Sequence, residues 1–164
     1  MKLSKNFSKA ELCKSQTATR MGLNNNPTDD QTENLRLLCE RVLQPVRDHF
    51  NQVVHVSSGF RDPILSQKIG SSIDSQHCKG EAADVEIFGV ANNELADWIK
   101  ENLMFDQLIL EYHTPGEPNS GWVHVSYTKE INSNRKEYLM ATKNATGKTE
   151  YKQILGLSTD RYVK

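Results

Sequence analysis

The chain has 164 residues, of which 37% are hydrophobic and 25% are charged, enough for one domain with its own hydrophobic core. Twenty lysines and arginines against 21 aspartates and glutamates give a net charge of -1, so no strong positive field is available to attract a nucleic acid. No apolar run approaches the roughly 20 residues that cross a bilayer. We therefore predict a single, monomeric globular domain over residues 1–164 that binds no nucleic acid and does not insert into a membrane.

The amino terminus and the cysteines bear on the compartment. The first six residues are not followed by the apolar stretch of a secretory signal, so we expect synthesis in the cytoplasm without a signal peptide. Cys13, Cys39 and Cys78 are odd in number and widely spaced, which argues against a disulfide framework and against a thiolate zinc ribbon. Three free thiols are expected. Cys78 adjoins His77, but we interpret it as a small buried residue rather than a metal ligand.

Two helices are predicted in the amino-terminal third. Ser8 and Glu11 have the spacing of a capping box, which predicts a short helix from this point. Apolar residues recur at three-four spacing over residues 31–43, which predicts a longer helix capped by Thr28 or Asp29. A proline follows at position 45 and is expected to bend this helix or to begin a second turn.

The rest of the chain is predicted to be mainly strand. Four segments are rich in β-branched or aromatic residues and bounded by turn residues: 53–58, 82–87, 107–112 and 122–127. A capped amphipathic helix over 92–100 separates the second from the third. This order predicts an α+β fold with a central, mainly antiparallel sheet flanked by the amino-terminal helices. Residues 136–142 are expected to add an edge strand, and residues 144–164 to form a peripheral or partly disordered tail.

A histidine, a carboxylate and a second histidine form a candidate metal site: His77, Asp84 and His124. Residues two apart in a strand share a face, so Asp84 and His124 both lie opposite the core valines of their strands, and His77 can reach them from the loop before Gly80. Two nitrogens and one oxygen are the ligands of an open zinc site, whose fourth position holds a water acidified to a pKa near 7. The alternative is a set of unrelated structural residues, because this spacing alone has low specificity.

The surrounding residues carry a resemblance to a known family. The segments concerned are 57–63 (SSGFRDP), 75–84 (SQHCKGEAAD), 105–111 and 122–126 (WVHVS), with further likeness at 7–12 and 43–47. They resemble the zinc D-Ala-D-Ala carboxypeptidase-like family of peptidoglycan peptidases, specifically its small phage-type and prophage-type members, over about residues 7–128. This family shares its fold group with lysostaphin-type and Hedgehog zinc domains. The resemblance implies one zinc per chain, bound by His77, Asp84 and His124, and a peptidoglycan peptide as substrate.

The resemblance also implies that Arg61 binds a carboxylate of the substrate. A guanidinium suits this role because it stays charged and offers a two-pronged hydrogen-bond donor, although a surface arginine at the end of a strand would look the same in the sequence. Ser75 and Gln76 are candidates for orienting His77 or for binding the substrate backbone.

The general base is where this chain departs from part of the family. Several zinc peptidases of this group carry a carboxylate three residues before the last histidine ligand, but here that position is Gly121. Glu111 is the best replacement, because a hairpin between the last two main strands would bring it beside His124. There it can take a proton from the zinc-bound water and pass it to the leaving amine.

Alternatives remain for the base and for the function. Glu117 and His113 lie in the connecting loop and are weaker candidates for the base, while Glu81 is expected to support the ligand loop. The predicted function is a zinc metallopeptidase that cleaves an amide bond of the cell wall, as a carboxypeptidase or an endopeptidase, free or attached to a virion. Rival hypotheses are a non-catalytic zinc-containing binding or virion structural domain, favoured by Gly121, and a small cytoplasmic dipeptidase.

Overall fold

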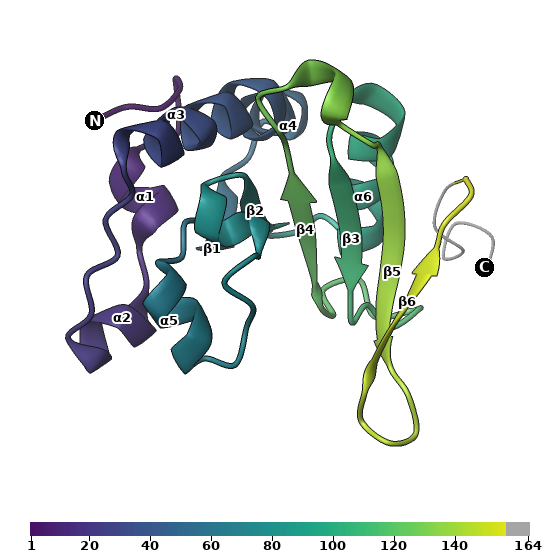
Figure 1. The fold of residues 1–164 in the computed structure, drawn as a ribbon. Coiled ribbons are helices and arrows are strands. Elements are labelled where there is room, and N and C mark those ends of the chain that lie inside the picture. The colour runs from purple at the N-terminus through teal and green to yellow at the C-terminus, as the bar shows by residue number, and fades with distance from the viewer. Residues whose placement is uncertain (157–164) are drawn as a thin grey trace.

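The computed structural model describes residues 1–156 and contains a six-stranded sheet with strand order β1-β2-β4-β3-β5-β6 (Figure 1). The strands are β1 (Val54–Ser58), β2 (Ala82–Ile87), β3 (Gln107–Glu111), β4 (Trp122–Ser126), β5 (Glu137–Lys143) and β6 (Thr149–Gln153). Neighbouring strands are antiparallel except for β3 and β5, which run parallel. The predicted α+β class and the mainly antiparallel sheet are confirmed.

Helices cover one end and one face of this sheet. They are α1 (Lys9–Cys13), α2 (Gln16–Met21), α3 (Asp29–Leu38), the π-helical turn η1 (Cys39–Leu43), α4 (Gln44–Phe50), α5 (Pro63–Lys68), α6 (Asn92–Asn102) and the 3-10 turns η2 (Gln76–Lys79) and η3 (Ile131–Ser133). None of the helices within residues 1–156 is long and apolar enough to cross a membrane.

The amino-terminal helices begin where their caps predict. The Ser8 hydroxyl accepts from the Glu11 amide and begins α1, and Thr28 forms a second capping box at the start of α3. From α3 the backbone continues through η1 into α4, with a wide turn in which the Gln44 amide donates to the Cys39 carbonyl. That turn lies just before Pro45, which has no N–H to donate. The proline therefore marks a new helical segment, as predicted.

The two faces of the sheet have different roles. On one face, α6 packs against β2, β3 and β4, and Leu95 and Ile99 of α6 are fully buried together with Val85, Val123 and Val125 of the sheet. The helices α1, α3 and α4 extend the same core toward β1. Because side chains alternate along a strand, the residues between those valines point to the opposite face. Asp84, His124 and Glu111, the strand residues predicted for the metal site and its base, lie on that second face.

The carboxyl-terminal part of the sheet differs from the prediction. The expected edge strand, β5, is not at an edge: it lies between β3 and β6. The edge is formed by β6, which comes from the segment expected to be a peripheral tail and pairs with β5 as a hairpin. The alternation of apolar and polar residues identifies a strand but not its neighbours in the sheet. This explains why residues 136–142 were predicted to be an edge strand. Residues 157–164, the rest of the predicted tail, lie outside the described residues.

Gly80 shows how tightly α3 holds the turn that carries His77. Its φ is +74°, and a Cβ at this position would lie 2.4 Å from the backbone oxygen of Gln31 in α3. We expect Gly80→Ala to lower the free energy of unfolding by about 1–3 kcal/mol for the backbone conformation alone, with a further loss from this contact. Gly70→Ala is the matched control, because Gly70 has a φ of +81° but open space around it. Equal losses in thermal unfolding would contradict the close packing.

Candidate metal centre

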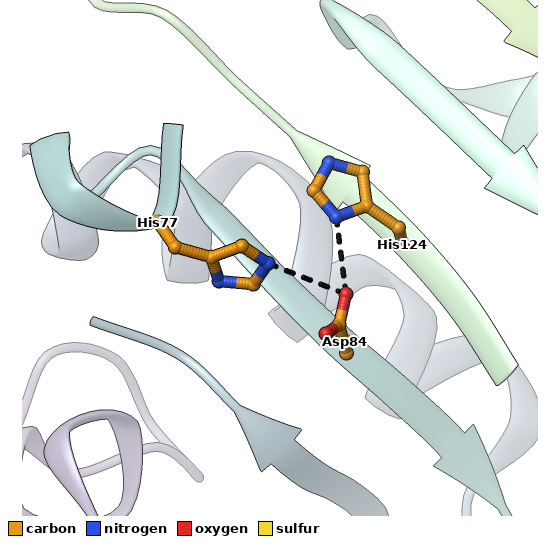
Figure 2. A group of neighbouring side chains, drawn as sticks. All are labelled: His77, Asp84 and His124. Carbon is orange, nitrogen blue, oxygen red and sulfur yellow. Dashed lines mark hydrogen bonds and ion pairs between the residues drawn. The ribbon is translucent and has the colours of Figure 1, made fainter. Parts of the chain in front are cut away.

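Three elements bring the predicted ligands together. Asp84 and His124 are directly paired across β2 and β4, on the face turned away from α6. His77 reaches them from η2, the turn that precedes β2. Figure 2 shows both imidazole rings pointing at the Asp84 carboxylate. One donor atom from each residue lies within 4.8 Å of the others, so the three predicted ligands converge at one point.

The hydrogen bonds of His77 fix which of its nitrogens faces the centre. Its Nδ1 lies 2.8 Å from the Gly59 carbonyl oxygen, which can only accept, so Nδ1 carries the proton. Nε2 therefore turns toward Asp84 Oδ1 at 3.4 Å, and His124 Nδ1 lies 3.0 Å from the same oxygen. Because His77 Nδ1 carries the proton of a neutral imidazole, Nε2 faces the carboxylate with a lone pair, an arrangement that requires a second proton or a cation between them. The donor set is the one that a zinc ion takes.

The electrostatics keep Asp84 ionised. Burial on its own would raise the pKa of Asp84, but hydrogen bonds from His124 and His77 outweigh it and hold that pKa well below its usual range. His77 and His124 are only 5% and 8% exposed. A buried carboxylate that remains an anion beside two imidazoles is suited to hold a divalent metal without further protons.

The turn that carries His77 is held by its neighbours. The Ser75 hydroxyl accepts from the His77 amide at 3.2 Å, while α3 donates from Gln31 to the Cys78 carbonyl and from Asn34 to the Lys79 carbonyl. These bonds leave η2 little freedom. Cys78 is buried in this turn with a free thiol and is not part of the metal-ligating group found among residues 1–156.

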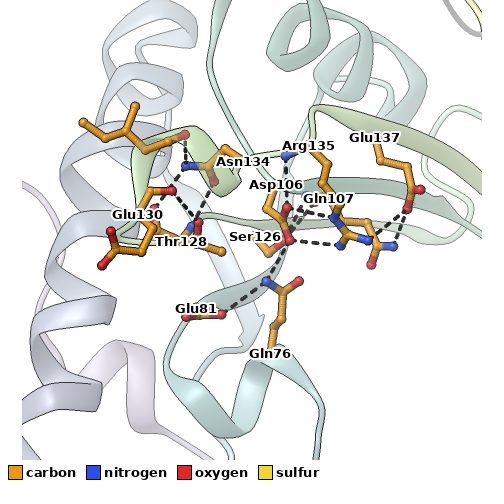
Figure 3. Close-up of polar contacts among 11 residues, drawn as sticks. Gln76, Glu81, Asp106, Gln107, Ser126, Thr128, Glu130, Asn134, Arg135 and Glu137 are labelled. Carbon is orange, nitrogen blue, oxygen red and sulfur yellow. Dashed lines mark hydrogen bonds and ion pairs between the residues drawn. The ribbon is translucent and has the colours of Figure 1, made fainter.

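Gln76 ties the same turn to the start of β3. Its amide donates to Asp106 Oδ2 at 3.0 Å and to Glu81 Oε2 at 3.2 Å (Figure 3). Asp106 is 4% exposed and accepts from the Arg135 guanidinium at 2.9 and 3.0 Å and from the Arg135 amide at 3.1 Å. Burial opposes ionisation of Asp106, but Arg135 outweighs it and lowers its pKa. Gln76 and Glu81 thus support the ligand turn, as one interpretation of the sequence had it.

A pocket of about 480 Å³ opens over the candidate metal ligands, and its other walls include Arg61, Ser75, Gln76, Glu111, Trp122 and Tyr151. Arg61 follows β1, and its amide donates to the His77 carbonyl at 3.1 Å. Its guanidinium donates to the Ser58 hydroxyl at 3.1 Å. The structure therefore places Arg61 at the wall of the pocket, beside the ligand turn.

Glu111 ends β3 on the side of the pocket next to His124. It pairs with Trp122, while Ile109 on the same face pairs with His124. Burial and the negative charge of Asp84 raise the pKa of Glu111, and His124, the Trp122 indole N–H and Arg61 offset only part of that rise. The indole nitrogen is buried and has no hydrogen bond of good geometry within residues 1–156. A pocket carboxyl with a raised pKa has the properties of a proton acceptor and donor.

The other candidates for the base lie elsewhere. Glu117 is exposed in the loop between β3 and β4, and neither it nor His113 is among the residues that line the pocket. His113 is buried, with its ring against Ser120. At Gly121 the φ is +67°, and a Cβ would lie 1.9 Å from the Glu111 carbonyl oxygen. Position 121 therefore has no room for any side chain, and a carboxylate there is excluded.

A comparison with protein families agrees with this geometry. The model of the family described as Peptidase M15 matches residues 5–126, which is well over half of the chain and includes all three candidate ligands. The chain belongs to the Peptidase M15 family. The predicted resemblance to D-Ala-D-Ala carboxypeptidase-like proteins is thereby confirmed at the level of this family. A search of curated proteins finds no match to the chain.

Two features of the site lie outside the part matched to Peptidase M15 and were not predicted from the sequence. Arg135 completes the Asp106 network, and Tyr151 of β6 lines the pocket. Neither belongs to a recognisable motif. Their one signal was the strand character of residues 136–142, because a further strand beside β3 brings both flanking segments toward the site.

The Arg135 pair predicts a pH-dependent contribution to stability. Arg135 lowers the folded-state pKa of Asp106 from its ordinary 3.8, so the stabilisation is present above about pH 4 and disappears as the pH falls through the folded pKa. We expect Arg135→Ala to cost about 1–2 kcal/mol at pH 7, since the arginine is half-exposed, and the gap to wild type to narrow below pH 4. Urea unfolding from pH 3 to 7 measures it.

Arg36→Ala is the matched control for this experiment. Arg36 also pairs with carboxylates, Glu33 of α3 and Glu40 of η1, but on the exposed surface, where such pairs contribute little. A loss for Arg135→Ala that stays constant down to pH 3, or that equals the loss for Arg36→Ala, would contradict a specific role for the Asp106 pair.

Proposed function

We propose that this protein is a zinc-dependent peptidase that hydrolyses an amide bond in the peptides of bacterial peptidoglycan. The observation that carries the proposal is the convergence of His77, Asp84 and His124 at a pocket whose walls also hold Glu111 and Arg61. Membership of the Peptidase M15 family supports the peptidase chemistry. The peptidoglycan substrate rests on the sequence resemblance.

The chain supplies the three protein ligands of an open zinc site. His77 Nε2, an Asp84 oxygen and His124 Nδ1 would hold the metal. When bound, zinc supplies a Lewis acid and a coordinated water of lowered pKa. Asp84 contributes a negative charge that persists at neutral pH, and the Gly59 carbonyl keeps His77 in the tautomer that presents Nε2.

Glu111 is proposed as the group that moves protons. Its raised pKa lets it accept a proton from the attacking water and return it to the leaving nitrogen near neutral pH. It lies on β3 beside the strand of His124, and it pairs with Trp122. Two other carboxylates among residues 1–156 line the pocket: Asp84, which is a proposed ligand, and Asp74, which is exposed in the turn before η2.

Arg61 is proposed to bind a carboxylate of the substrate. It lies on the β1 side of the ligands, whereas Glu111 lies on the β3 side. A guanidinium here would anchor the portion of the peptide that leaves, with the scissile amide over the ligands. Ser75 acts on the ligand turn through its bond to the His77 amide, and Gln76 through its bonds to Asp106 and Glu81.

Metal binding gives the first test. We expect one zinc per chain by metal analysis, and a gain in the free energy of unfolding of about 2.7 kcal/mol at zinc concentrations 100-fold above the dissociation constant. His77→Ala removes one ligand and should abolish most of that gain. His55→Ala is the control, because His55 is exposed on β1 and is not in the ligand group. Equal zinc stabilisation of both variants would rule out the proposed centre.

Turnover gives the second test. Purified peptidoglycan and its peptides should release new amino or carboxyl ends in a reaction that a chelator stops and zinc restores. Glu111→Gln should keep zinc but lose activity by about 10²–10⁴-fold, while Glu117→Gln in the exposed loop should keep it. Zinc binding without chelator-sensitive cleavage would support the non-catalytic hypothesis instead, and full activity of Glu111→Gln would remove Glu111 from the mechanism.

A further inference from the structure

The residues that line the pocket are arranged in the order of the strands of the sheet. Arg61 follows β1, Asp84 is on β2, His124 is on β4 and Glu111 is on β3. Tyr151, on the edge strand β6, lines the same pocket. The candidate carboxylate anchor and Tyr151 are therefore at opposite ends, with the metal ligands and Glu111 between them.

Strand register puts Tyr151 in line with Glu111. Glu111 pairs with Ala141 of β5, and Ala141 pairs with Tyr151, so the three side chains form one row on one face of the sheet. Ala141 carries only a methyl group, and no larger side chain of this row separates Tyr151 from Glu111. Partial burial and the charge of Glu111 raise the pKa of Tyr151, which agrees with their proximity. Tyr151 is 57% exposed, so most of its ring is available for contact.

The β5–β6 hairpin is fixed to the site. β5 pairs with β3 along all five residues of that strand, and the Tyr112 hydroxyl lies 2.6 Å from the Thr149 hydroxyl at the start of β6. The Tyr112 ring in turn packs against Trp122, with ring centroids 5.3 Å apart. Tyr151 is thus presented on a sheet strand next to other aromatic rings, beyond the residues matched to the family.

We propose that Tyr151 is a substrate-binding residue that contacts the peptide on the amino-terminal side of the bond to be cleaved. The inference rests on the proposed function for its direction: if Arg61 holds the leaving, carboxyl-terminal portion, the acyl portion must run the other way, past Glu111 toward β6. An aromatic ring on a sheet strand offers a rigid surface for peptide backbone and aliphatic side chains.

Distance makes the contact dependent on substrate length. The three strand spacings from β4 to β6 amount to about 14 Å, and the Tyr151 side chain covers part of that gap. An extended peptide advances about 3.3–3.6 Å per residue. A dipeptide anchored at Arg61 therefore ends near the metal ligands, whereas a peptide with about three further residues on the acyl side reaches the tyrosine ring.

The test compares two synthetic peptides that share the bond cleaved in purified peptidoglycan, one with a single residue and one with four residues on its amino-terminal side. For Tyr151→Ala, the ratio of kcat/KM for the long peptide to that for the short one should fall roughly three- to tenfold, chiefly through KM. Tyr151→Phe keeps the ring and should lie much closer to wild type. Lys152→Ala, with its side chain on the other face of β6, is the matched control, and zinc content is checked for each variant.

A second measurement separates this inference from the proposed function. Calorimetric binding of the long peptide to zinc-loaded Glu111→Gln, with and without Tyr151→Ala, reads affinity without turnover. Weaker binding through Tyr151→Ala with no hydrolysis by wild type would uphold the tyrosine contact and overturn the peptidase. Hydrolysis of both peptides with an unchanged ratio, or an equal loss for Lys152→Ala, would overturn the role of Tyr151.

Discussion

The site depends on one buried anion, Asp84, held between two imidazoles. A carboxylate in this position is costly unless opposite charge or donors compensate it, and the only groups that reach its Oδ1 as ion-pair partners within residues 1–156 are His77 and His124. Strand pairing supplies His124 directly, because it is opposite Asp84 in the register of β2 and β4. Strand pairing does not fix the position of His77, because this residue lies on a turn. Much of the surrounding structure can be understood as the means of keeping that turn in place.

Three separate parts of the chain hold the turn. Helix α3 packs so closely that Gly80 meets the Gln31 backbone; the Gly59 carbonyl after β1 orients the His77 ring; and Gln76 reaches the Asp106–Arg135 pair beside β5. Because these supports come from distant segments, the ligand geometry is a property of the whole domain. A substitution far from the candidate metal centre can therefore change its geometry without touching His77, Asp84 or His124.

The sequence predicts the ligands better than it predicts their surroundings, for a physical reason. Alternation with period two assigns each side chain of a strand to a face, and it correctly put Asp84 and His124 on the face away from the core. Alternation carries no information on which strand lies next to which. The interior position of β5 and the position of Tyr151 at the pocket were therefore not predicted. The short helices α2 and α5 were not predicted either, because helices of six residues depend on caps and tertiary contacts more than on periodicity.

Sheet geometry explains why the candidate base of this chain is at position 111 and not at position 121. Gly121 immediately precedes β4, and the space that its side chain would need is occupied by the backbone oxygen of Glu111 at the end of β3. A side chain at 121 and this close approach of the two strand ends exclude each other. The same approach places Glu111 opposite Trp122, two residues from His124 on the same face. The backbone contact that leaves no room for a carboxylate at position 121, before β4, thus accompanies the placement of Glu111, at the end of β3, in the pocket. Gly121 is therefore compatible with a catalytic centre.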